Sequence, residues 1–377
     1  MLWHWSYKRI RAVPLALGLV VLSFFLLNAL FSRLEMKLLD LRDHDGYVWQ
    51  HKLHLLSDGS LSQAEVLILG DSQVMGGIFP SAMEGNSRSV YNLGLPSQQP
   101  EGMVLLARMA VEKMPKLKRV IINVSPFSVF KSDISVSFRK FYKNEALHFY
   151  PVTLLRNPAQ AGGVGDWFYQ LLRISPVFRF RDITFHFTSI GEVHKTDVPE
   201  LMREKEEVEN YLLNGPNLSV AQNRRREKNG FIREELNRNQ GFWIWNRFVP
   251  LDASPERVCQ VSGEKMANTG WKLLYPDRSG AIAAWRELLS VFSNRNIPVV
   301  LVRIPFEDSW HSIADSKDVN RRFTEKIEKI LAGSDNTIFL DRPDSWPSDD
   351  SSLYRDWVHL SFCGAQKYSS WLRGQLN

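Results

Sequence analysis

The longest apolar run of the chain lies near its N-terminus. Residues 12–32 carry no charged side chain, and as a helix they extend about 31 Å at ~1.5 Å per residue, enough to cross a bilayer. A buried core helix normally shows a polar stripe, whereas this run is apolar all round except Ser23 and Asn28. A cleaved signal peptide needs a small-x-small cleavage site, which residues 28–31 match poorly. The pattern favours an uncleaved transmembrane anchor that follows a cytoplasmic tail, residues 1–11.

Basic residues flank this run unequally. Lys8, Arg9 and Arg11 precede it, whereas the basic residues that follow it are offset by Glu35. The positive-inside tendency therefore predicts an N-terminus in the cytoplasm and the rest of the chain outside the membrane. No later run approaches bilayer length. We expect a juxtamembrane stalk over residues 33–63, followed by a soluble domain.

Over residues 64–377, short patterns of buried strands alternate with helical patterns. Such alternation favours a parallel sheet covered by helices on both faces. We therefore predict an α/β domain with about five parallel strands. Strands are expected at 65–69, 89–93, 119–124, 299–303 and 337–340, and helices near 78–83, 101–113, 281–294, 319–331 and 364–376.

The alternation stops after Phe130, and residues 131–279 form an insertion without a strand-helix rhythm. Loops and ligands gather at the carboxyl edge of a parallel sheet, so an insertion there can form a lid or a docking surface. Trp243, Trp245 and Trp271 within it are candidates for stacking on sugar rings, although core packing explains them more simply.

Composition excludes several classes of function. The net charge is +6, but no basic run is interleaved with aromatic residues, which makes nucleic-acid binding a poor interpretation. The two cysteines, Cys259 and Cys363, form neither a disulfide framework nor a zinc-ligand set, and the sequence leaves open whether they pair. A cluster near the membrane is explained more simply by a polar stalk than by a metal site, and it consists of Asp43, His44, Asp45, His51 and His54. We predict no metal and no cofactor.

Two polar motifs follow strands at the expected carboxyl edge of the sheet. Ser72 stands directly after the first predicted strand, although Asp71 and Ser72 are also ordinary capping residues. Asp356 and His359 lie in the last loop, where an acid three residues before a histidine can hold Nδ1 and leave Nε2 free to take a proton from a serine. A parallel sheet brings these loops together, so their joint occurrence predicts a serine-centred catalytic site.

These motifs resemble those of the SGNH (GDSL-like) hydrolases, through residues 70–72 and through Asp356-x-x-His359. The resemblance implies a flavodoxin-like three-layer sandwich and assigns catalysis to Ser72, Asp356 and His359. Residues 91–97 look like the second family block, whose backbone N–H helps form the oxyanion hole. By the spacing of this block, Ser97 rather than Gly94 occupies the position where the family usually has glycine, and both residues belong to the candidate oxyanion set. The third block departs from the family, since residues 122–127 contain no Gly-x-Asn-Asp. Ser125 is a replacement donor by this interpretation, and Asp71 and Arg303 complete the candidate substrate-binding set.

The combination of an anchor with these blocks most resembles bacterial envelope proteins that assist O-acetylation of exported polysaccharides or D-alanylation of teichoic acids. The resemblance implies a domain on the outer side of the cytoplasmic membrane and a membrane-bound O-acyltransferase as partner. It predicts an O-acyltransferase that forms an acyl-enzyme on Ser72. A carbohydrate or acyl esterase, and a non-catalytic scaffold of the same fold, are the alternatives. His311 is a further candidate for the lining of the site.

Overall fold

The computed structural model describes residues 16–30, 44–84, 89–96, 98–130, 229–243, 259, 280–310 and 316–376. The chain divides into two compact units. One is formed by Met1–Asp43 and Arg156–Glu227, and the other by His44–Leu155 and Lys228–Asn377. All strands that the structure describes belong to the second unit.

In the first unit, residues 16–30 form a helix. Its apolar side chains are exposed, and Val20 and Phe25 are 66% and 65% accessible. No helix among the described residues is both long enough and apolar enough to cross a membrane. Residues 12–15 and 31–32 of the expected anchor lie outside the described residues, so the anchor stays a prediction.

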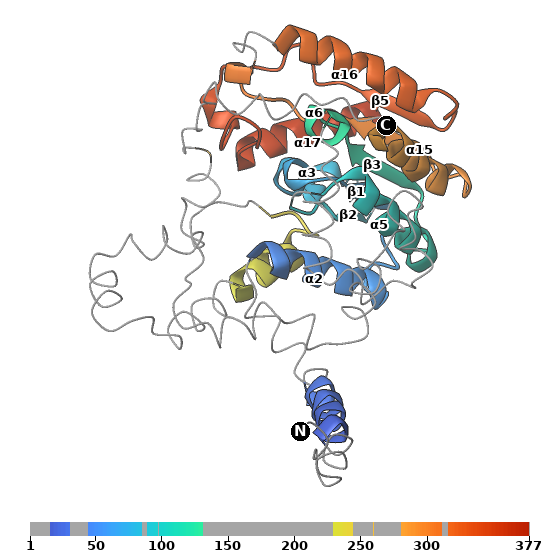
Figure 1. Cartoon of the computed structure of the whole chain (residues 1–377). Helices are drawn as coiled ribbons and strands as arrows, with labels where there is room; N and C mark the ends of the chain where they lie inside the picture. The colour runs from blue at the N-terminus through green and yellow to red at the C-terminus, as the bar shows by residue number, and fades with distance from the viewer. Residues whose placement is uncertain are drawn as a thin grey trace, which may run out of the picture. The chain divides into compact units, whose positions relative to one another are not determined.

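The second unit is built on a sheet of five parallel strands, which confirms the predicted α/β class (Figure 1). The strand order is β2-β1-β3-β4-β5. The first four strands are buried along almost their whole length, because helices cover both faces, whereas β5 is an edge strand that is partly exposed. Their bounds are β1 Val66–Leu69, β2 Val90–Asn92, β3 Arg119–Asn123, β4 Val299–Val302 and β5 Thr337–Leu340.

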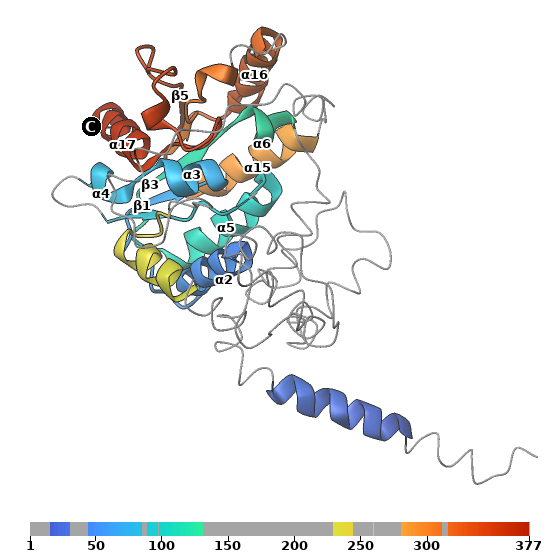
Figure 2. The same ribbon diagram turned by 90° about the vertical axis from the view of Figure 1, so that its left-hand side faces the viewer.

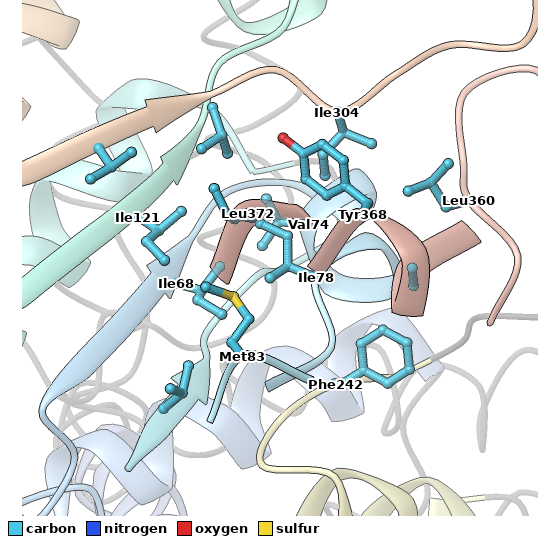
Figure 3. Close-up of a cluster of buried hydrophobic side chains, with 14 of the residues drawn as sticks. Ile68, Val74, Ile78, Met83, Ile121, Phe242, Ile304, Leu360, Tyr368 and Leu372 are labelled. Atoms are coloured by element: carbon cyan, nitrogen blue, oxygen red, sulfur yellow. The ribbon is translucent and has the colours of Figure 1, made fainter. Parts of the chain in front are cut away.

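Helices form a layer on each side of this sheet (Figure 2). On one face α3, α4 and α17 pack against Ile68, Ile121 and Val300 in a continuous core (Figure 3). On the other face α5 packs against α15, and α16 lies beside α15. The helices are α3 Ser72–Gly77, α4 Pro80–Met83, α5 Pro100–Lys113, α6 Pro126–Phe130, α15 Gly280–Ser293, α16 Ser316–Leu331 and α17 Phe362–Leu376, with short 3₁₀ turns η4 Asp308–Trp310 and η5 Ser351–Leu353.

The helix α2 (His44–Ser57) lies within residues 33–63, the expected juxtamembrane stalk, and it belongs to the second compact unit. Tyr47 and Trp49 are fully or almost fully buried, and α2 packs on α5. Lys52 is buried as well, so polar and apolar residues share the covered surface and the sequence shows no clear stripe. His51, one of the clustered histidines, is hydrogen-bonded to Asn237. The second unit therefore includes residues 44–63, which precede the expected start of the α/β domain at residue 64.

The described part of the insertion is joined closely to the sheet. Gln240 O accepts a hydrogen bond from Asn92 N in β2, and Trp243 N donates to Met75 O in α3. Gly241 has a φ of +84°, and a Cβ there would lie 2.1 Å from Asn92 O, so only glycine fits. Trp243 is 2% exposed, which supports core packing for this tryptophan. Trp245 and Trp271 lie outside the described residues.

A disulfide joins Cys259 of the insertion to Cys363 in the first turn of α17. The sequence left this pairing open, because a separation of 104 residues carries no information about distance in the fold. The bond connects the insertion to the helix that follows the candidate histidine.

Candidate active site

The nucleophile candidate lies in the tight turn that leaves β1. Gly70 allows this turn, since a Cβ at that position would lie 2.7 Å from a methyl carbon of Val74. Asp71 caps α3 by accepting a hydrogen bond from Gln73 N at 3.0 Å. Ser72 is consequently the first residue of α3, half-buried at the carboxyl end of β1.

Ser72, His359 and Asp356 form a continuous hydrogen-bonded chain. His359 Nε2 lies 2.9 Å from Ser72 Oγ. On the other side of the ring, His359 Nδ1 lies 2.8 Å from each carboxylate oxygen of Asp356. These distances are within the range at which a base takes a proton from a nucleophile. The arrangement can activate a serine hydroxyl at neutral pH.

The loop around Asp356 is held by hydrogen bonds between its backbone N–H groups and the Asp356 carboxylate. Asp356 Oδ1 accepts hydrogen bonds from Val358 N at 3.0 Å and from His359 N at 2.9 Å. The side chains of Asp356 and His359 are 19% and 15% exposed. The carboxylate therefore fixes both the course of the loop and the orientation of the imidazole.

Arg355 adds a positive charge behind this pair. Its Nη2 lies 3.0 Å from Asp356 Oδ2 and 3.3 Å from His359 Nδ1. Burial alone would raise the pKa of the Asp356 carboxyl. The hydrogen bond to His359 and the charges of His359 and Arg355 outweigh burial and hold that pKa well below its ordinary range. Asp356 is therefore ionised whenever the domain is folded near neutral pH.

A second polar network surrounds the turn that carries Ser72. Asn123, the last residue of β3, donates from Nδ2 to Asp71 Oδ1 at 3.3 Å and to Gln73 Oε1 at 3.2 Å. Gln73 Nε2 donates to Val358 O at 3.1 Å. Burial raises the pKa of the Asp71 carboxyl, against the opposing influence of the Gln73 N–H and His359. Asp71 therefore holds the turn that carries Ser72, whereas the hydrogen bond with the Ser72 hydroxyl is made by His359.

The backbone of Gly94, a member of the candidate oxyanion set, is hydrogen-bonded within the protein. Its N–H donates to Asn92 Oδ1 at 2.9 Å, and its carbonyl accepts from Lys52 Nζ at 2.7 Å. Trp49 Nε1 donates to the neighbouring Pro96 O at 3.1 Å. Burial lowers the pKa of Lys52 well below its ordinary value. The loop after β2 is thus held by α2, and the N–H of Gly94 already has an acceptor.

The other candidate substrate-binding residues have different outcomes. Ser125 is 1% exposed, and its Oγ has no hydrogen-bond partner in the described part of the chain. Its role as a replacement donor stays a prediction. Ser97 and His311 lie outside the described residues.

The guanidinium of Arg303, a candidate for binding an anionic substrate group, is paired with a carboxylate of the protein. It forms a bidentate pair with Asp341 at 2.6 and 2.8 Å and a longer bond to Asn320. Its guanidinium also lies over the ring of Phe323. Of the two roles considered from the sequence, the structure therefore has the carboxylate pair.

Three residues that shape this site were not predicted from the sequence, namely Gln73, Asn123 and Arg355. Each one stands next to a candidate residue or at a strand end, which is the only signal that the sequence offers. Their partners depend on side-chain directions that become fixed only when β1, β3 and the last loop meet.

A comparison of the chain with protein-family models finds no match, and a comparison with curated proteins finds none either. The indication of its chemistry is therefore the geometry of Ser72, His359 and Asp356. Ser72 follows β1, which lies between β2 and β3 where the strand order changes direction. Ligands of open parallel sheets commonly bind at such a point.

Proposed function

We propose that this protein is a membrane-anchored O-acyltransferase of the SGNH type that acts outside the cytoplasm through an acyl-enzyme on Ser72. The observation that carries the proposal is the 2.9 Å contact between Ser72 Oγ and His359 Nε2, with Asp356 behind the imidazole. The five-stranded order 2-1-3-4-5 supports the flavodoxin-like form of the fold, since it is the order of that class.

The mechanism follows from these contacts. Ser72 Oγ attacks the carbonyl carbon of the acyl donor while its proton passes to His359 Nε2. The tetrahedral intermediate collapses to the acyl-enzyme, and His359 returns the proton to the leaving oxygen. An acceptor hydroxyl then gives its proton to His359 and attacks the acyl carbon. As the second tetrahedral intermediate collapses, His359 returns that proton to Ser72 Oγ and the acylated acceptor leaves. Asp356 stabilises the imidazolium formed in both halves of the reaction.

Two features support a location outside the cytoplasm. Disulfides persist mainly in oxidising compartments, and Cys259 is bonded to Cys363. The apolar run over residues 12–32 supplies an anchor with more basic residues on its N-terminal side. An anchored domain there faces envelope polysaccharides, and a membrane-bound O-acyltransferase is the partner that fits as the source of acyl groups.

The test is covalent labelling of the full-length protein in detergent micelles with a fluorescent fluorophosphonate. We expect labelling at Ser72, its complete loss in Ser72→Ala, and a fall of about 10²–10⁴-fold in His359→Ala. Ser370→Ala is the matched control, because Ser370 is an exposed serine on α17. Equal labelling of the wild type and Ser72→Ala would sink the proposal.

Transfer is distinguished from hydrolysis by the fate of the acyl group. With an acetyl ester as donor and an oligosaccharide as acceptor, a transferase gives acetylated sugar, whereas an esterase gives acetate at the same rate with or without the sugar. The outcome decides between the proposed transferase and the esterase alternative.

A non-catalytic scaffold is the second candidate, and one observation favours it. The Gly94 N–H and the Asn123 amide, which stand in or near the family's oxyanion blocks, are both bonded within the protein. One oxyanion donor is worth roughly 2.7–4 kcal/mol of the barrier. A scaffold would leave Ser72 unlabelled in the wild type, so the same labelling experiment separates the two functions.

A further inference from the structure

We propose that Gln73 is a positioning residue that fixes the loop of Asp356 and His359 against the helix that carries Ser72. This inference rests on the proposed function, since it concerns how that site is held in register. It gives a role to a buried side chain that takes no part in the proton transfers described above.

Gln73 is 3% exposed, and its backbone N–H, its Oε1 and its Nε2 each take part in a hydrogen bond. Its backbone N–H donates to Asp71 Oδ1 at 3.0 Å. Its side-chain Oε1 accepts from Asn123 Nδ2 at 3.2 Å, and its Nε2 donates to Val358 O at 3.1 Å. One residue thus connects the turn after β1, the end of β3 and the last loop.

The orientation of the two amides follows from their partners. A carbonyl oxygen such as Val358 O can only accept, so Gln73 must present Nε2 to it. Oε1 then faces Asn123, which must present Nδ2. The same Nδ2 also faces Asp71 Oδ1, another acceptor. Reversing either amide would oppose two acceptors, so the network has one consistent arrangement.

The position of Gln73 in the sequence makes this bridge specific to the site. Gln73 follows Ser72, and Val358 precedes His359, so the two hydrogen bonds join adjacent pairs across 287 and 285 residues of sequence. The bond between Ser72 and His359 fixes one point of contact between α3 and the loop, and the parallel bond between Gln73 and Val358 fixes a second point directly beside it. A misplacement of ~1 Å between reacting groups reduces a rate by roughly 100-fold.

The experiment compares Gln73→Met and Gln73→Glu with the wild type, using full-length protein in detergent micelles. Met fills a similar volume without either polar group, and Glu keeps an acceptor for Asn123 while facing Val358 O with an oxygen. The measurements are the rate of fluorophosphonate labelling at Ser72 and the kcat and KM for p-nitrophenyl acetate. We expect both variants to lose about 10–100-fold in labelling rate and kcat, with KM within about twofold of the wild type.

Ser369→Ala is the matched control. Ser369 Oγ accepts a hydrogen bond from Phe79 N at 2.8 Å, which also joins the N-terminal and C-terminal parts of the domain. We expect this variant to lose stability without losing reactivity at Ser72. A labelling rate of Gln73→Met within twofold of the wild type, or a loss matched by Ser369→Ala at equal Tm, would overturn the inference alone. An unlabelled wild type would overturn the proposed function and this inference with it.

Discussion

The disulfide between Cys259 and Cys363 supports a quantitative prediction about stability. It closes a segment of 104 residues. In the chain-entropy description, a loop of about 100 residues confers roughly 4.7 kcal/mol at 25 °C by restricting the unfolded chain, and native disulfides contribute about 2–5 kcal/mol. We therefore expect Cys363→Ser to lower the free energy of unfolding by about 2–5 kcal/mol.

The assay is thermal unfolding of the full-length protein in detergent, followed by circular dichroism with and without a reductant. For a domain of roughly 150–250 residues, each 1 kcal/mol shifts Tm by about 2–4 °C, so a decrease on the order of 10 °C is expected. Cys259→Ser, Cys363→Ser and the double variant should unfold at the same temperature, because all three remove one bond. Reductant should lower the wild type to that temperature and leave the variants unchanged.

Two results would refute this reasoning. If the effects of the single variants add up in the double variant, the cysteines act independently and are not bonded to each other. If reductant leaves the wild type unchanged while free thiols appear, the bond forms but does not restrict the unfolded chain as described. In either case the support that the disulfide gives to an oxidising compartment would have to be reconsidered.

Three further predictions concern the site. Burial raises the pKa of Asp71 above that of the unfolded chain, so the stability linked to its proton is present below about pH 4 and is lost as pH rises. Asp71→Asn should therefore stabilise the domain at about pH 7 and lose this advantage in acid, and denaturant unfolding at the two pH values measures the difference. The lowered pKa of Asp356 makes its contribution fully present above about pH 4, and the contribution decreases as pH falls toward the folded pKa. Asp356→Asn should therefore cost about 1.5–3 kcal/mol at pH 7, and a difference that does not decrease at all between about pH 5 and about pH 2 would contradict the assignment. Gly94→Ala places a Cβ 2.7 Å from Met75 N, so it should destabilise the domain by about 1–3 kcal/mol and slow labelling of Ser72, whereas unchanged labelling would show that the loop moves without disturbing α3.

The sequence predicted the elements whose burial is uniform. β1 and β4 consist only of Val, Ile and Leu, and β3 has Val120, Ile121 and Ile122 at its centre, so these short buried apolar runs identify the strands. The meeting of Ser72 with His359 was predictable because parallel strands bring their carboxyl ends to one edge of the sheet. The anchor and the catalytic role stay predictions.

Other features depend on contacts that no local pattern contains. The helix α2 was missed because Lys52 is buried beside apolar residues and donates to Gly94 O, which lies 42 residues away in the sequence. The acceptor of the Gly94 N–H was not predictable either, since it is the side chain of Asn92, which lies two residues earlier. For Arg303 the sequence left two roles open, an anionic substrate group or a carboxylate partner. The choice depended on Asp341, which lies after the next strand.

The long separation between Ser72 and His359 also has a consequence for biosynthesis. The two residues are 287 positions apart, and His359 belongs to the loop that precedes the last helix. At roughly 5–20 residues per second, a ribosome needs about 15–60 s to extend the chain from one to the other. During that interval the nascent chain carries a serine without its base. In the proposed mechanism, reactivity at Ser72 therefore arises only after His359 has been synthesised, and a chain truncated before residue 356 should remain inert towards acyl donors.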